Sequence, residues 1–254
     1  MSKAFDSIAS KVSHAVLAML RDPKGIGEEQ LAGGGAIARV EEKLCAWYGV
    51  EHCLLVNNAT NGLFALALVA DLTESEIIVP PQSYGATYGP LKFLNNRLIV
   101  SQSDVQGNMS VDSVAELISP ATKAVWATDL DGQPHDTAAL KRVCAEHRIK
   151  YFSDAASSLG RMKDGSPASS CADAWVVSLG PNKSLFCGEG GAILTNDATL
   201  YERLVWLTQH PHRYRREFSL CGHLEEQFLN ARIHPLAAIL AEALLPNVLG
   251  EYER

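Results

Sequence analysis

The feature that most constrains the fold of this chain is a regular alternation of short apolar segments with segments of helical periodicity. Helix-like segments lie between most of the apolar runs, at 61–70, 85–94, 112–118 and 136–147. Alternating strands and helices predict an α/β fold with a mainly parallel sheet and helices on both faces. Near-continuous apolar runs are typical of strands covered on both sides. Seven strands are expected, at 53–57, 76–80, 97–101, 123–128, 150–154, 174–178 and 191–195.

The connection between the last two predicted strands is short. Twelve residues, 179–190, separate them and show little helical pattern. A right-handed parallel crossover normally needs a longer segment that contains a helix. We therefore expect the seventh strand to be antiparallel. A charged helix at 197–209, an irregular basic and aromatic stretch at 209–223 and a final helix at 233–245 are expected to follow it.

The N-terminal segment, residues 1–32, is expected to be helical. Apolar side chains recur at helical spacing, and charged or polar residues interrupt any continuous apolar run, so an amphipathic helix is predicted rather than a signal peptide or membrane span. A helix with this much apolar surface usually packs against another protein surface, such as that of a partner subunit. The apolar positions are Phe5, Ile8, Val12, Val16 and Met19.

Length, charge and cysteine content limit the possible classes of function. The 254 residues suit one large α/β domain or two smaller ones. A net charge of -7 argues against a broad nucleic-acid surface. The six cysteines are dispersed without a CxxC pair, so neither a metal site nor a disulfide framework is expected, and we predict a reduced, cytoplasmic protein. Cys187 lies near the candidate site described below, although a small loop residue is the favoured interpretation.

Ligands of open α/β sheets bind outside the carboxyl ends of the strands, so the residues that follow each strand are informative. Thr60 and Asn61 stand where a strand passes into a helix, where free N–H groups attract anions, although simple capping by Asn58 or Thr60 explains them too. Asp154 ends a strand; a desolvated carboxylate there would require a cation such as a protonated ring nitrogen, a metal or an arginine. Its alternative is a helix N-cap.

Two further places carry candidate residues. Tyr84 follows the second strand and would lie flat on a planar ligand, unless it is an ordinary buried tyrosine. Ser178 ends a strand, and Lys183 follows in a glycine-flanked loop. A desolvated lysine is a nucleophile or base, whereas a solvated loop lysine does nothing specific. Together, an amine, a carboxylate, an anion-binding helix start and an aromatic plate are the parts that would hold pyridoxal 5′-phosphate.

From about Gly33 onward the sequence resembles the DegT–StrS type of sugar aminotransferases, pyridoxal-phosphate enzymes of fold type I. Six ordered segments carry the likeness, at compatible spacing. "ATDLDGQPHD" (127–136) resembles the family's "HLYGQPAD", "SDAASSLG" (153–160) its "EDAAQAHG", and "FLNARIHPLAAILA" (228–241) its "YNYRMSELQAAI". The others are the opening at 33–68 with its "SGT"-like turn, "IIVPPQSYGAT" at 77–87, and the lysine motif "VVSLGPNKSLFCGEGGAILTND" at 176–197.

The resemblance implies a role for each candidate. Lys183 would form the Schiff base and move the proton, and Asp154 would pair with the pyridinium nitrogen. Tyr84 would stack on the cofactor ring. Asn230 would reach the phosphate of the neighbouring subunit, which implies a homodimer with shared active sites. Thr60, Asn61 and Ser178 would hold the phosphate.

Several positions depart from the family pattern. Ser157 replaces a glutamine that supports the ring hydroxyl or neighbouring groups, which would leave a gap, admit water or allow a different substrate. The family's histidine in "HLYGQP" is Asp129, and the glycine of its "SGT" turn is Ala59. Asn182 and Ser184 flank the lysine where the family has threonine and asparagine. The substrate pocket is therefore expected to be re-lined.

The chain also stops where the family's C-terminal small domain would begin, so we expect 33–254 to be the large domain. The small domain would come from a separate chain, or dimer partners would cover the site, or the chain is a fragment.

The leading hypothesis is an aminotransferase that moves an amino group from an amino acid, glutamate or glutamine, to a keto intermediate such as a keto sugar. The retained lysine argues against the sugar-dehydratase branch of the family, which has histidine there. One alternative is another carbanion reaction of the same cofactor: elimination, racemisation or condensation. Another is a non-catalytic or incomplete subunit that needs a partner chain. Arg213, Arg215 and Arg216 are expected to lie in a solvated charged loop rather than to clamp a substrate.

Overall fold

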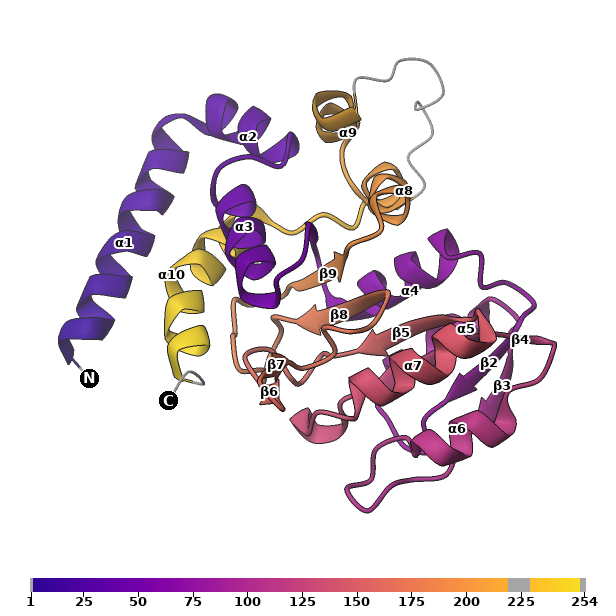
Figure 1. Cartoon of the computed structure of the whole chain (residues 1–254). Coiled ribbons are helices and arrows are strands. Elements are labelled where there is room, and N and C mark those ends of the chain that lie inside the picture. The colour runs from indigo at the N-terminus through magenta and orange to yellow at the C-terminus, as the bar shows by residue number, and fades with distance from the viewer. Residues whose placement is uncertain (1, 219–228, 252–254) are drawn as a thin grey trace.

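A seven-stranded sheet forms the centre of the computed structural model, which describes residues 2–218 and 229–251. Its spatial order is β1-β9-β8-β5-β4-β2-β3, and a separate two-stranded hairpin, β6 with β7, lies outside it (Figure 1). The strands are β1 (His52–Val56), β2 (Glu76–Val79), β3 (Arg97–Val100), β4 (Thr122–Thr128), β5 (Lys150–Asp154), β6 (Met162–Lys163), β7 (Ser166–Pro167), β8 (Ala174–Ser178) and β9 (Gly191–Thr195).

Strand β9 is antiparallel to both of its neighbours, β1 and β8, while every other pair in the seven-stranded sheet is parallel. The mainly parallel sheet and the antiparallel last strand are thereby confirmed. The 12-residue connection turns back without crossing a face of the sheet. Two of its residues, Asn182 and Gly188, have the positive φ angles of 64° and 97° that tight turns require.

Helices cover both faces of the sheet, as predicted. Helices α4 (Ala59–Val69), α5 (Gly85–Phe93) and α8 (Ala198–Thr208) pack on one face. Helices α3 (Ala36–Tyr48), α6 (Val111–Leu117), α7 (Thr137–His147) and α10 (Pro235–Glu251) pack on the other. Consecutive strand residues alternate between the two cores: in β2, Ile77 and Val79 belong to the first and Ile78 to the second.

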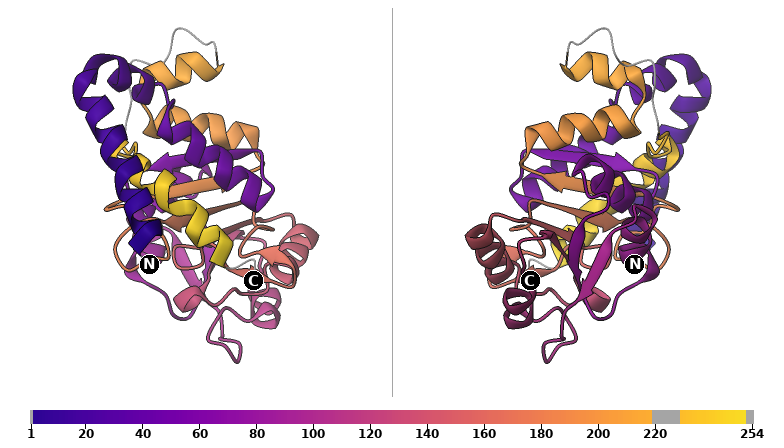
Figure 2. Two further views of the ribbon diagram at one scale, coloured as in Figure 1. Left: turned by 90° about the vertical axis from the view of Figure 1, so that its left-hand side faces the viewer. Right: turned by 90° about the vertical axis from the view of Figure 1, so that its right-hand side faces the viewer.

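The first two helices are α1 (Ser2–Arg21) and α2 (Pro23–Leu31). Figure 2 shows α1 lying beside α10, and Val12 and Ala15 pack against the apolar core there. Leu17 and Leu20 remain exposed. The N-terminal segment is therefore helical and packs on the C-terminal helix of its own chain. The division into a segment 1–32 and a domain 33–254 stays a prediction.

The prediction of an irregular stretch at 209–223 is wrong where the structure describes this segment, because α9 (Pro211–Phe218) forms there. Residues 219–223 lie outside the described residues. Pro211 begins the helix at the position that tolerates its missing N–H. The final helix also runs further than predicted, to Glu251. The other predicted elements differ from the structure by one or two residues at their ends, which is where helices and strands fray.

Arg213 was expected in a solvated loop and is instead buried, with 2% of its surface exposed. Its guanidinium donates to both carboxylate oxygens of Glu41, at 3.0 and 2.9 Å, and to Glu217 at 2.7 Å. Gly33 has a φ of +73° and lies so close that a Cβ would be 2.8 Å from the Arg213 side chain. Arg215 and Arg216 are exposed, as expected for a solvated charged surface.

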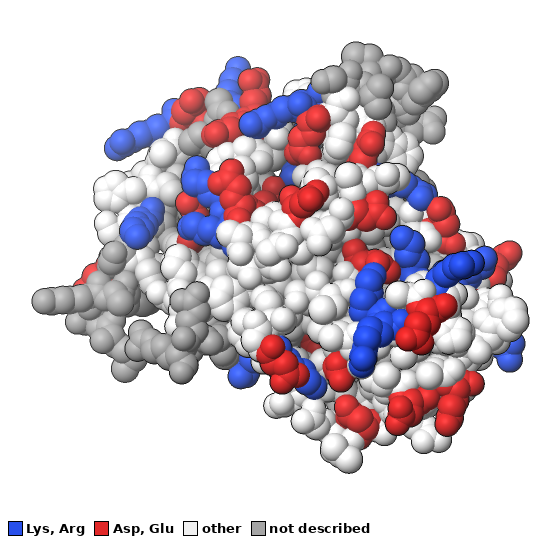
Figure 3. Space-filling model, in the orientation of Figure 1, with Lys and Arg blue, Asp and Glu red and all other residues white. Residues whose placement is uncertain are grey.

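Charged side chains of both signs intermingle on the face shown in Figure 3, without a dominant sign. Some form surface ion pairs, such as Arg39 with Glu242 at 2.6 Å and Arg203 with Asp71 at 2.8 Å. Exposed pairs of this kind contribute little to stability. Within 2–218 and 229–251, no helix has the length and apolar character needed to cross a membrane. Over the same ranges, no group of His, Cys, Asp and Glu side chains is arranged to hold a metal ion.

Candidate active site

A cavity of about 680 Å³ opens at the carboxyl ends of the parallel strands. It is the place where the fold brings distant strand ends together. Seven of the eight predicted site residues line it, and the eighth, Asn230, does not. The seven are Thr60, Asn61, Tyr84, Asp154, Ser157, Ser178 and Lys183.

Asp154 ends β5 at the floor of this cavity and is 5% exposed. One carboxylate oxygen accepts from the Thr87 hydroxyl at 2.6 Å, and the other accepts from the Ala156 N–H at 3.1 Å. Burial raises the pKa of Asp154 above its ordinary value, and the nearby charge of Asp129 adds to the rise. The Thr87 and Ala156 hydrogen bonds and the charge of Lys183 oppose it only in part. A cation placed beside Asp154 would favour its charged form.

Lys183 is half-buried in the 179–190 connection and lines the same cavity. Its Nζ donates to the hydroxyl of Ser157 at 2.8 Å. The backbone is turned at Asn182, whose φ is 64°, and Lys183 N–H donates to the Gly180 carbonyl at 3.3 Å. The lysine is thus fixed by its loop and by a partner on the next strand end. The Ser157 hydroxyl thus contacts the amine, and the expected gap, water molecule or different substrate at this position stays a prediction.

The start of α4 forms another wall of the cavity. The side chain of Asn58 caps the helix by accepting from Asn61 N–H at 2.8 Å, so the capping interpretation is correct for Asn58. The first N–H groups of a helix have no partner within the helix and carry its positive dipole, which suits an anion. Gly191 allows the close approach, since a Cβ there would lie 2.7 Å from Ala59 N.

Tyr84 precedes α5 and is 81% exposed, so the alternative of an ordinary buried tyrosine is wrong. It stands between the cavity and a second, open apolar hollow of about 630 Å³. Phe64 and Phe93 line that hollow, with their rings edge to face at 5.4 Å. An exposed ring at the rim of a polar cavity is free to stack on a flat ligand.

Asn230 is exposed outside the cavity, and its side-chain oxygen accepts from Arg232. The neighbouring backbone is anchored to the end of β1, where Asn57 N–H donates to the Ala231 carbonyl at 2.6 Å. Its place outside this chain's own cavity is compatible with a role toward another subunit.

Cys187 is buried, and burial raises the pKa of its thiol to about 11. The Sγ lies 3.4 Å from the Leu179 carbonyl, to which it donates. A protonated, buried thiol of this kind is unreactive, which agrees with the interpretation of a small structural residue.

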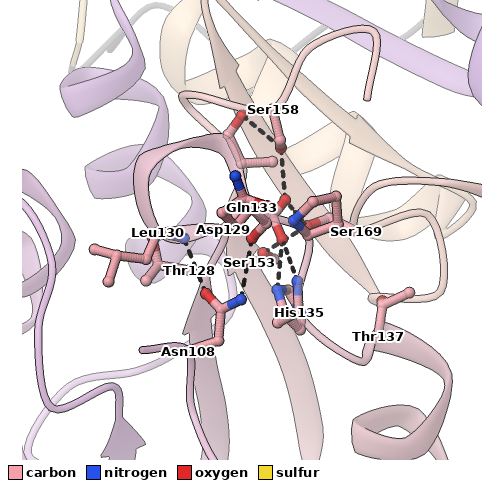
Figure 4. Close-up of polar contacts among 12 residues, drawn as sticks. Asn108, Thr128, Asp129, Leu130, Gln133, His135, Thr137, Ser153, Ser158 and Ser169 are labelled. Carbon is pink, nitrogen blue, oxygen red and sulfur yellow. Dashed lines mark hydrogen bonds and ion pairs between the residues drawn. The ribbon is translucent and has the colours of Figure 1, made fainter. Parts of the chain in front are cut away.

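Sequence reasoning gave no role to two buried residues of the site, Asp129 and His135. Asp129 directly follows β4, and Asp154 is the last residue of the neighbouring strand β5. The side chain of Asp129 lines the cavity. It accepts hydrogen bonds from the backbone and ring of His135 and from the hydroxyls of Ser158 and Ser169 (Figure 4). A signal was present, since Asp129 directly follows a predicted strand, but its partners lie too far along the chain to be found by spacing.

Comparisons with known proteins agree with this geometry. The model of the DegT/DnrJ/EryC1/StrS aminotransferase family matches residues 23–248. UDP-4-amino-4,6-dideoxy-N-acetyl-beta-L-altrosamine transaminase of Helicobacter pylori is 30% identical over 73% of this chain and 50% of its own length. GDP-perosamine synthase of Escherichia coli O157:H7 is 30% identical over 68% of this chain and 48% of its own length.

A solved structure of DesI in the presence of its TDP-sugar product has a TM-score of 0.79 and 30% identity, covering 96% of this chain and 59% of that one. The chain thus spans about half the length of the curated relatives that it matches. Sheet order, the lysine-bearing connection between β8 and β9 and the family match lead to the same conclusion. The chain belongs to the DegT/DnrJ/EryC1/StrS aminotransferase family.

Proposed function

We propose that this chain forms the cofactor-binding part of a pyridoxal-phosphate-dependent aminotransferase that acts on a keto sugar. The observation that carries the proposal is the pairing of a buried carboxylate, Asp154, with the half-buried amine of Lys183 across one cavity. Each group alone has ordinary explanations. Together, inside a cavity that starts at a helix N-terminus, they match the two ends of one cofactor.

Two observations support the fit of that cofactor to the residues present. The raised pKa of Asp154 shows a carboxylate whose burial is incompletely compensated, and a protonated pyridine nitrogen would compensate it. The start of α4 and the Ser178 hydroxyl offer donors for a phosphate.

When bound, pyridoxal phosphate supplies an electron sink that stabilises a carbanion next to the transferred nitrogen. The chain's own residues then have separate tasks. Asp154 would hold the ring nitrogen protonated, and Tyr84 would lie against the ring. Lys183 would carry the amine that attaches the cofactor, and it would move a proton between the two carbon atoms on either side of the transferred nitrogen. Ser157 holds that amine at 2.8 Å.

The acceptor is proposed to be a sugar linked to a nucleoside diphosphate, with glutamate or glutamine as donor. This follows the names of two relatives, a UDP-amino-sugar transaminase and GDP-perosamine synthase. A homodimer is proposed to complete the site, with Asn230 directed to the phosphate of the neighbouring subunit. A small-domain segment, on this or another chain, would close the site. We place the protein in the cytoplasm because its cysteines are dispersed and free in the described ranges.

The test is the attachment of the cofactor to one lysine. Wild-type protein incubated with pyridoxal phosphate should gain visible absorbance, and borohydride reduction followed by peptide mass spectrometry should locate the adduct at Lys183. Lys183→Ala should show neither. Lys163→Ala is the matched control, because Lys163 donates to the Pro134 carbonyl and does not line the cavity. A wild-type protein that takes up no cofactor contradicts the proposal.

Adding glutamate tests the reaction type. Transamination converts the bound cofactor to its amine form, so the visible absorbance should disappear and 2-oxoglutarate should accumulate in equal amount. Unchanged absorbance with every amino donor tried would contradict transamination and favour another carbanion reaction or a chain that needs a partner.

A further inference from the structure

The cavity contains a second buried carboxylate that the proposed reaction does not use. Asp129 is 2% exposed, and His135, which contacts it, is fully buried. Asp129 Oδ1 accepts from His135 N–H at 3.0 Å and contacts His135 Nδ1 at 2.6 Å. Its Oδ2 accepts from the hydroxyls of Ser158 at 2.5 Å and Ser169 at 2.8 Å. Figure 4 shows these groups converging on Asp129 from three separate segments.

The carboxylate is ionised in this setting. Burial by itself would raise the pKa of Asp129, but the charge and hydrogen bond of His135 and the two serine hydroxyls hold it below its ordinary value. An ionised carboxylate only accepts, so Nδ1 of His135 carries the proton between them. The other ring nitrogen, Nε2, is bonded to the Tyr151 hydroxyl, which donates to Thr137 at 3.0 Å. The ring is therefore fixed from both sides.

Two backbone segments are tied together by Asp129. The short helix η1 (Leu130–Gly132) follows it, and His135 closes the loop back onto its carboxylate. Ser158 belongs to the turn after β5 and is the direct neighbour of Ser157. The contact between the segments is tight: Gly132 has a φ of +77°, and a Cβ there would lie 2.7 Å from the Ser157 carbonyl oxygen. Ser157 is thus held by its neighbour on one side and by the loop on the other.

Ser157 in turn accepts from Lys183 Nζ at 2.8 Å. A continuous set of contacts therefore runs from His135 through Asp129 and the 157–158 turn to the amine in the cavity.

We propose that Asp129 and His135 form a buried positioning pair that holds the turn carrying Ser157, and through Ser157 the amine of Lys183. The importance of this pair for catalysis rests on the proposed function. Its effect on the position of the Lys183 amine does not depend on that function, and this effect can be measured in protein without cofactor.

The experiment is competitive labelling of lysines in the cofactor-free protein with an amine-reactive anhydride, read peptide by peptide by mass spectrometry. Asp129→Asn should loosen the turn and free the amine, raising the labelling rate of Lys183 roughly twofold to tenfold, the equivalent of one net hydrogen bond. Ser157→Ala should give a similar rise. His135→Ala should act in the same direction as Asp129→Asn. Lys141, bonded to Asp173, serves as an internal reference in every sample.

The double variant separates positioning from electrostatics. Asp129→Asn also removes a negative charge from the cavity. A change in Lys183 labelling caused by that charge alone would persist in protein that lacks the Ser157 hydroxyl. If Asp129 acts through Ser157, Asp129→Asn with Ser157→Ala should label no faster than Ser157→Ala alone. The other charged groups that line the cavity with Lys183 are Asp131, Asp154 and Glu189, and they stay unchanged in all variants.

Ser158→Ala provides a variant without a charge change, should Asp129→Asn fail to fold. It removes one donor to Asp129 and should raise Lys183 labelling in the same direction. Ser113→Ala is its control, because Ser113 is also buried and its hydroxyl accepts from Gln102 N–H at 2.9 Å, outside the Asp129 cluster. Unchanged labelling in the Asp129, His135 and Ser158 variants overturns the proposal, as does a rise that persists in full without Ser157. Failure of wild type to take up pyridoxal phosphate would count against the proposed function only.

Discussion

Two buried aspartates end neighbouring parallel strands, and the structure treats them in opposite ways. Asp129 follows β4 and Asp154 ends β5, and the backbone N–H of Asp129 donates to the carbonyl of Asp154 at 3.2 Å. Both are 5% exposed or less. The carboxylate of Asp129 accepts four hydrogen bonds, two of them from a histidine, whereas the carboxylate of Asp154 accepts two.

The pKa of each group follows from its partners. Burial favours the neutral form of both, yet His135, Ser158 and Ser169 lower the pKa of Asp129, while Thr87, Ala156 and Lys183 leave that of Asp154 raised. The carboxylate satisfied by its own fold suits a structural task. The incompletely compensated one is the better candidate to bind a cation from outside, as functional sites often do.

The largest effect is expected from Asp154→Asn, which keeps the shape of the side chain and removes its charge. Losing one member of a buried ion pair costs about 3–5 kcal/mol. The affinity for pyridoxal phosphate should therefore fall roughly a hundredfold to several thousandfold, as measured by titration of the visible absorbance. An affinity within about threefold of wild type would show that Asp154 is not the partner of the ring nitrogen.

The second prediction compares the stability of the cofactor-free proteins. Asp129→Asn should lower the free energy of unfolding by about 2–3 kcal/mol, because the amide cannot accept from all the donors that surround the carboxylate. Asp154→Asn should lower the free energy of unfolding only slightly or should raise it, since this substitution removes a charge whose burial is unfavourable. Urea unfolding of the three proteins measures this difference. Equal losses in both variants would remove the distinction between the two aspartates.

A smaller effect is expected in the pH dependence of stability. The pKa of Asp129 is lower in the folded protein, so its stabilisation is present above the unfolded value of about 4 and is lost as the pH falls through the folded value. The pKa of Asp154 is higher when folded. Its contribution is present below about 4 and is lost as the pH rises through the folded value.

Urea unfolding of cofactor-free protein between acid and neutral pH should show these two opposite pH dependences of stability. The advantage of wild type over Asp129→Asn should shrink as the solution is acidified. Relative to Asp154→Asn, wild type should become less stable as the pH rises. Parallel pH curves for wild type and either variant would contradict the corresponding assignment.

The sheet was predictable from the sequence because its signals are local. Each strand is an apolar run, and the antiparallel direction of β9 follows from the length of one connection. That residues at the ends of β1, β2, β5 and β8 line one cavity was predictable for a related reason: parallel strands bring their carboxyl ends to one edge.

Contacts between distant residues were not predictable. The partner of Arg213 is Glu41, 172 positions away. Because nothing near Arg213 in the sequence indicates this ion pair, Arg213 was predicted to lie in a solvated loop. Asp129 draws its partners from positions 135, 158 and 169, and nothing in the spacing of these residues marks them as one cluster. That Ser157 contacts Lys183 also depends on how β5 and β8 pair rather than on either motif alone.

The smallest effect tests the contact through which Asp129 is proposed to act. Gly132 and Gly165 have nearly equal φ angles, +77° and +79°, so alanine is strained to a similar degree at both. At Gly165 a Cβ meets nothing within 4 Å, whereas at Gly132 it would lie 2.7 Å from the Ser157 carbonyl oxygen. Gly132→Ala should therefore cost about 1–2 kcal/mol more in unfolding free energy than Gly165→Ala. It should also change Lys183 labelling, while Gly165→Ala should not. Equal labelling in the two variants would mean that a shift of the Ser157 backbone does not reach the amine.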